Sequence, residues 1–174
     1  MKYRHTVNVS WSSTQNRDEF KIQAVKDCIP HLIEMLFLSD EDAIGQDTST
    51  IIQLVDTIET SADHLGRPVG ITVIPVQMEV KKTRQLTVKI RIDQSLHQML
   101  HTLAHEMEHV RQSYTADLVI GFITPTEHVN IWNGKAFSTK FFDYSDFPWE
   151  RQAEEVAHEF MEDVLEDALS FSPL

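Results

Sequence analysis

Apolar residues recur every three or four positions along three long stretches of the chain. Because residues at this spacing share one face of an α-helix, the pattern predicts helices over about residues 17–38, 93–115 and 148–169. Pro30 should kink or divide the first of these helices, since proline cannot donate the backbone hydrogen bond there. Asp93 is the expected N-cap of the second helix.

A further helix is expected between the first two. Either Asp47 or Thr48 can cap it, and Gly66 can end it, because glycine adopts a left-handed terminus at the least cost. The polar residues 40–46 ahead of it should form the connecting loop. The apolar positions of this predicted helix are Ile51, Ile52, Leu54, Val55, Ile58 and Leu65.

Other stretches of the chain have the pattern of β-strands. Residues 2–9 alternate between polar and apolar side chains, and residues 69–78 and 86–92 are rich in β-branched side chains with a polar turn between them. Asn133 and Gly134 stand between two short apolar runs, and both residue types tolerate the positive φ of a tight turn. The sequence therefore predicts a strand pair in the middle of the chain and a hairpin closer to its end.

The length and the apolar content of the chain bound its architecture. It has 174 residues, of which 41% are hydrophobic, enough to bury the core of one domain spanning residues 1–174. With the element pattern, this predicts an α+β fold: a small, mostly antiparallel sheet packed on the central helix, with a further C-terminal helix. No stretch approaches the roughly 18 consecutive apolar residues of a membrane span, and the N-terminus lacks an apolar signal segment. A single cysteine, Cys28, fits a reducing compartment, so we expect a cytoplasmic protein without a membrane partner.

The charge of the chain is strongly negative. Its 15 Lys and Arg residues against 27 Asp and Glu residues give a formal net charge of −12, which opposes attraction to phosphate backbones, so no direct nucleic-acid binding is expected. The charge also allows a second interpretation: an acidic binding protein, such as an inhibitor or a DNA mimic, with at most a structural or vestigial metal site. Acidic residues crowd the last predicted helix, where most should lie on a solvated face: Glu150, Glu154, Glu155, Glu159, Glu162, Asp163, Glu166 and Asp167.

A possible metal site lies within the helix predicted over residues 93–115. His105, Glu106 and His109 stand there in the spacing HExxH. Imidazoles four residues apart on a helix point to the same side, so both can reach one tetrahedral Zn²⁺ while the intervening glutamate reaches a zinc-bound water. The apolar stripe through Leu103 and Met107 lies nearly opposite, so the histidines should face solvent or a second wall of the molecule. The same five-residue pattern also occurs by chance on surface helices rich in His and Glu.

The last predicted helix offers a third ligand. On a helical wheel Glu150 projects into the apolar stripe of this helix, whereas Glu155 and Glu159 project away from it. A carboxylate directed at a packed face costs several kcal/mol unless a partner such as zinc is present. We therefore expect Glu150 to be the third ligand, and Glu154 to support a histidine ligand through its ring N–H or to exchange roles with Glu150. Alternatively, Glu150 is a first-turn acid favoured only by the helix dipole.

These segments together resemble a known group of enzymes. The strand over residues 86–92, the HExxH helix and the downstream residues 150–154 (Glu-Arg-Gln-Ala-Glu) resemble the gluzincin branch of the zinc peptidases, as in thermolysin-like enzymes. The short chain and the Pro-Trp-Glu at residues 148–150 look like the small gluzincin domains of bacteria and their phages. The resemblance covers about residues 86–168. Two departures from related patterns are the lack of a metzincin Gly-x-x-His or Gly-x-x-Asp after the motif and a long interval before the third ligand.

The resemblance implies a function for each of these residues. His105, His109 and Glu150 would bind Zn²⁺, and Glu106 would be the general base that activates water for attack on a peptide bond. The strand before the HExxH helix would form the upper wall of a cleft that binds a peptide or protein substrate by edge pairing. The substrate identity and the oligomeric state stay open at this point.

Several other polar residues are weaker candidates for the site. His101 either lines the mouth of the cleft or is simply a solvated helical histidine. His128, His158, Tyr144 and Arg111 are each able to hydrogen-bond a developing oxyanion, and the sequence does not select among them.

Overall fold

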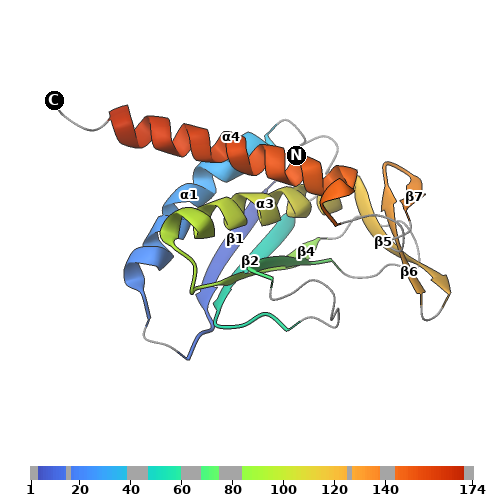
Figure 1. The fold of residues 1–174 in the computed structure, drawn as a ribbon, viewed down its shortest axis with the longest axis horizontal. Helices are drawn as coiled ribbons and strands as arrows, with labels where there is room; N and C mark the ends of the chain where they lie inside the picture. The colour runs from blue at the N-terminus through green and yellow to red at the C-terminus, as the bar shows by residue number, and fades with distance from the viewer. Residues whose placement is uncertain are drawn as a thin grey trace.

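The computed structural model describes residues 4–14, 17–38, 47–59, 68–74, 84–124, 127–137 and 144–170. Within these ranges the chain forms three α-helices and two small sheets, which confirms the predicted α+β class (Figure 1). The elements in chain order are β1 (His5–Trp11), α1 (Glu19–Phe37), β2 (Thr48–Val55), β3 (Gly70–Val73), β4 (Gln85–Arg91), α3 (Leu96–Thr115), β5 (Leu118–Thr124), β6 (Glu127–Trp132), β7 (Lys135–Phe137), the 3₁₀ turn η1 (Tyr144–Asp146) and α4 (Pro148–Ser170).

The larger sheet has the strand order β1-β2-β4-β3. Strand β2 is central and pairs in parallel with β1 and β4, whereas β3 pairs antiparallel with β4 and is the outermost of the described strands at that end. The parallel pairing of β1 and β2 requires a crossover connection, and α1 provides it. The smaller sheet, β5-β6-β7, is antiparallel throughout. The mostly antiparallel pairing expected from the sequence thus describes β3 and the smaller sheet, while the other two pairings are parallel.

Helix α3 is the central element of the fold. It packs against α1, α4, β3 and β4, and Figure 1 shows it between the larger sheet and α4. Leu103, Met107 and Val110 are fully buried in one core cluster with Phe160 of α4. Full burial of such a side chain contributes about 1.5–3 kcal/mol each, so this contact holds α3 firmly against its neighbours.

Helix α3 begins at a capping box. Ser95 is the N-cap, and its side chain accepts a hydrogen bond from the backbone of Gln98, whose own side chain accepts from the backbone of Ser95. The prediction that Asp93 caps this helix was wrong, because that carboxylate instead accepts a hydrogen bond of 3.0 Å from Arg91. A serine followed three residues later by glutamine satisfies two backbone donors at once, which a single aspartate does not.

The prediction of a helix from Asp47 or Thr48 was wrong over the first half of that segment, where the chain forms β2. Thr50, Ile52 and Leu54 are fully buried on alternate positions, the period of a strand. The same apolar residues also fit a helical spacing, but the β-branched run favours an extended chain, and strands on both sides complete its hydrogen bonds.

Helix α1 runs through Pro30 without a break, and the hairpin turn has φ of 47° at Asn133 and 76° at Gly134, as its sequence predicted. Cys28 is half-buried and packs against the core. The expectations for residues 1–3, 40–46, 60–66, 75–78 and 81–83 lie outside the described residues. Within the described ranges, no helix has both the length and the apolar character needed to cross a membrane.

His5 makes the stability of the fold dependent on pH. Its ring stacks on Phe37 with centroids 4.3 Å apart, and its Nδ1 lies 2.7 Å from Oγ1 of Thr48. Burial lowers the pKa of His5 to about 4, below the value of about 6.5 expected in the unfolded chain. Because the unfolded chain takes up a proton on His5 below pH ~6.5 and the folded chain only below about 4, the free energy of unfolding decreases between these two values, and the loss is complete below about 4.

We expect the free energy of unfolding to fall by up to about 3 kcal/mol through His5 as the pH drops across this window. Urea denaturation at a series of pH values measures it. The variant His5→Gln should have a flatter pH dependence than the wild type, whereas His31→Gln, at an exposed histidine, should not. Identical slopes for all three proteins would contradict the assignment to His5.

Candidate metal centre

Three side chains predicted to bind a metal meet between α3 and α4. His105 and His109 point from α3 toward the first turn of α4, which is the second wall expected from the helical wheel. The two Nε2 atoms are 3.2 Å apart. Oε2 of Glu150 lies 3.3 Å from each of them. The three atoms therefore form a nearly equilateral triangle.

The size of this triangle fits a zinc ion. In a tetrahedral site with ligand distances of about 2.0–2.1 Å, neighbouring ligand atoms are separated by about 3.3 Å. The distances here, 3.2 and 3.3 Å, match that edge length without any movement of the side chains. Two imidazole nitrogens and one carboxylate oxygen are also a donor set that suits zinc, with a fourth position left for water or substrate.

The electrostatics of the triangle favour a cation. His109 and Glu150 are each only 5% exposed, and a buried carboxylate is costly unless positive charge compensates it. Burial by itself would lower the pKa of His109, but the hydrogen bond to Glu150 and the charges of Glu106 and Glu150 outweigh it and raise the pKa to about 9. A proton on His109 thus balances the carboxylate at neutral pH, and a divalent cation held by the same atoms would replace that proton.

The second ring nitrogen of each histidine also has a partner. Nδ1 of His109 lies 2.9 Å from Oε1 of Gln112, and Nδ1 of His105 lies 3.4 Å from Oε2 of Glu154. Partners of this kind fix the ring orientation and the tautomer of a metal ligand, so that Nε2 keeps its lone pair for the metal. The supporting role expected for Glu154 agrees with this position, while Glu150 alone of the two acids joins the triangle with both histidines.

Packing around Trp149 determines where Glu150 lies. Trp149 is 3% exposed and stacks on Phe147, with ring centroids 4.5 Å apart. It also contacts Trp132 and Phe137 of the smaller sheet. Its backbone carbonyl accepts a hydrogen bond of 3.1 Å from Nε2 of the Gln112 amide on α3. The first turn of α4 is therefore fixed on both sides, and the carboxylate of the next residue is directed at the two imidazoles.

Glu106 is held beside the triangle by the edge strand β3. Thr72 of this strand donates a hydrogen bond of 2.7 Å to Oε2 of Glu106. Gly70 leaves room for the carboxylate, because a Cβ at this position would lie 2.9 Å from Oε1 of Glu106 and 2.4 Å from a methyl group of Thr102. Burial raises the pKa of Glu106, against the opposing effects of His109, His105 and Thr72. A raised pKa makes a carboxylate a better proton acceptor.

A pocket of about 190 Å³ opens next to these residues, lined by Glu106, His109 and Glu150 together with residues of β3, β5 and β6. The wall on the side of the sheet is β3, and not the strand that directly precedes the HExxH helix. That strand, β4, lies inside the sheet between β2 and β3. Most of the remaining lining is apolar and comes from Ile71, Ile74, Leu118, Ile120 and Trp149.

The weaker candidates lie apart from this pocket or outside the described part of the chain. The guanidinium of Arg111 forms an ion pair of 2.7 Å with the buried carboxylate of Glu108 and lies 3.4 Å from the carboxylate of Asp117. It therefore pairs with acids of the fold and does not line the pocket. His158 lies on the exposed side of α4, with 69% of its side chain accessible. The side chains of His128 and Tyr144 are not among those described.

Gln112, Thr72 and Gly70 were not anticipated from the sequence. The contact of Gln112 with His109 could have been predicted from the sequence, because Gln112 follows His109 by three residues and so lies on the same face of the helix. The contacts of Thr72 and Gly70 with Glu106 could not, because they depend on how a separate strand packs on α3.

No model of a known protein family, no curated protein and no solved structure matches this chain.

We expect Glu150→Ala to weaken zinc binding by more than about 100-fold, because it removes one of three protein ligands and leaves two imidazoles. Competition with a zinc-chelating dye measures the affinity. Glu155→Ala, at an exposed position on the next turn of the same helix, is the matched control and should bind zinc as the wild type does. Equal losses in both variants would contradict the ligand assignment.

We expect Gln112→Ala to weaken zinc binding by about 10- to 100-fold, although Gln112 does not reach the metal position. The variant loses the partner of His109 Nδ1 and the contact that holds the first turn of α4. Gln23→Ala is the control, because Gln23 makes only an exposed hydrogen bond to Asp27. An unchanged affinity in Gln112→Ala would show that His109 does not need this support.

Proposed function

We propose that this protein is a zinc-dependent peptidase in which His105, His109 and Glu150 bind the metal. The observation that carries the proposal is the triangle of ligand atoms, with sides of 3.2 to 3.3 Å, at the edge of a pocket that Glu106 also lines. A purely structural zinc site has four protein ligands and is closed. Three ligands beside a pocket leave a position where water and substrate have access.

Each residue around the triangle has a separate role in the proposed hydrolysis. A zinc ion bound there would lower the pKa of a coordinated water toward ~7 and polarise the carbonyl under attack. Glu106 accepts the proton of the attacking water and returns it to the leaving amine, since it lines the same pocket and its pKa is raised by burial. Thr72 keeps the carboxylate of Glu106 in one orientation throughout.

The apolar lining of the pocket and its position beside β3 support a peptide substrate with an apolar side chain. Strand β3 is the outermost described strand at this end of the larger sheet. An extended peptide can add to such an edge through main-chain hydrogen bonds. The mainly apolar lining, which includes Ile71, Ile120 and Trp149, would then accept an apolar side chain next to the cleaved bond.

We expect Glu106→Gln to keep its zinc and to lose hydrolysis by about 100- to 10,000-fold, because an amide cannot accept the proton. Peptide-library cleavage followed by mass spectrometry measures activity, and elemental analysis of the same samples measures zinc. Glu155→Gln serves as the control with full activity. Undiminished hydrolysis in Glu106→Gln would rule out this residue as the base.

Metal content also separates the peptidase from the acidic binding protein that the charge allows. A peptidase should contain zinc that a chelator removes, with loss of activity and recovery when zinc is added back. A preparation that takes up no metal and cleaves none of the library would instead favour the binding protein.

A further inference from the structure

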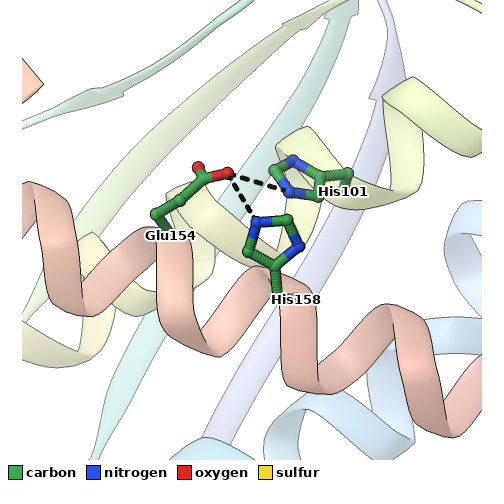
Figure 2. Close-up of side chains that lie close together, drawn as sticks. All are labelled: His101, Glu154 and His158. Carbon is green, nitrogen blue, oxygen red and sulfur yellow. Dashed lines mark ion pairs between the residues drawn. The ribbon is translucent and has the colours of Figure 1, made fainter.

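A second group of metal-binding side chains lies on the outer side of the metal centre. His101 of α3 and His158 of α4 both face the carboxylate of Glu154, as Figure 2 shows. Oε1 of Glu154 lies 3.4 Å from Nε2 of His101 and 3.2 Å from Nε2 of His158. The two imidazole rings meet edge to face, with centroids 5.3 Å apart. The proposed peptidase chemistry uses neither of these histidines.

The two groups of metal-binding side chains lie next to each other, about one helical turn apart, along α3 and α4. Potential metal ligands recur every four residues on each helix: His101, His105 and His109 on α3, and Glu150, Glu154 and His158 on α4. Residues four apart lie on one helix face. The helices pack antiparallel here, since Glu150 faces His105 and His109 while His158 lies near His101. The outer group therefore lies about one turn along from the inner one and has the same composition, one carboxylate and two imidazoles, but its second imidazole comes from α4.

We propose that His101, Glu154 and His158 form a second binding site for a divalent transition metal, with zinc as its natural occupant. Two of the distances between ligand atoms, 3.4 and 3.2 Å, are already close to the edge of about 3.3 Å for tetrahedral zinc. All three ligand atoms lie within 4.8 Å of one another. The His158 side chain is 69% exposed, so burial does not fix its rotamer and a small rotation can adjust its distance to the other two ligands.

The donor set determines which ions this outer site selects. Two imidazoles favour Zn²⁺, Ni²⁺ or Cu²⁺ over Ca²⁺ and Mg²⁺, which prefer oxygen ligands. The Glu154 side chain is 50% exposed, so water completes the coordination. The outer site should therefore bind zinc more weakly than the inner site, where the ligands are buried and already in place.

Ordinary surface ion pairing is the competing explanation of these contacts. Exposed pairs of this kind contribute at most about 1 kcal/mol, and they do not require that three donors converge. Here a single oxygen faces two imidazole nitrogens from two different helices. An ion pair and a metal site predict different responses to added zinc, so zinc binding decides between them.

The outer site also connects to the inner one through Glu154. Its other oxygen, Oε2, lies 3.4 Å from Nδ1 of His105, whose Nε2 belongs to the inner triangle. A change at Glu154 would therefore disturb both sites. His101 and His158 belong only to the outer group, which makes them the residues to vary.

The test is the number of zinc ions bound per chain, measured on the full-length protein by equilibrium dialysis against Zn²⁺ followed by elemental analysis. We expect two ions per wild-type chain, the second at least about 10-fold weaker. His101→Gln and His158→Gln should each retain one tightly bound ion. The matched control His31→Gln removes an exposed histidine that also pairs with an acid of α4, Asp163, and should still bind two.

A second ion that persists in both His101→Gln and His158→Gln, or a wild-type chain whose single ion is retained in both of these variants, would overturn the outer site. Failure of the inner site has a different signature. If Glu150→Ala leaves the tight ion in place while His158→Gln removes the weak one, the inner assignment is wrong and the outer one stands. Circular dichroism on each variant verifies that it is folded.

Discussion

The packing of α4 on α3 brings a buried carboxylate against two imidazoles, and the rest of the site depends on this contact. Glu150 is 5% exposed, so its negative charge requires a positive partner at close range. His109 supplies one through its raised pKa of about 9, and a bound zinc ion would supply a stronger one. The buried carboxylate of Glu150 therefore needs positive charge close to it, and the same close approach to the two imidazoles places three ligand atoms where a metal ion can bind.

The surrounding packing keeps this contact in place from several directions. Trp149 anchors the first turn of α4 in an aromatic cluster with the smaller sheet. Gln112 joins that turn to α3 and also orients His109. Strand β3 closes the other side and holds Glu106 through Thr72. The aromatic cluster, the polar contacts and strand β3 come from separate parts of the chain, so the geometry of the site depends on tertiary contacts among α3, α4, β3 and the smaller sheet.

The sequence predicted the features whose cause is local. The spacing of His105 and His109 on a helix, and the inward direction of Glu150, follow from helical periodicity alone, and the structure has both on facing sides of α3 and α4. The strand β2 could not be predicted in the same way. Its apolar residues fit two periods, and the choice between them depends on pairing with β1 and β4, far away in the sequence. The positions of Thr72 and Gly70 were unpredictable for a similar reason, since each acts through a contact between elements.

The direct test of the zinc site is a crystal structure of the zinc-loaded protein with anomalous diffraction data at the zinc absorption edge. We expect an anomalous peak about 2.0–2.1 Å from Nε2 of His105, Nε2 of His109 and Oε2 of Glu150. Zinc bound to the protein elsewhere, with no peak inside that triangle, would contradict the proposed zinc site.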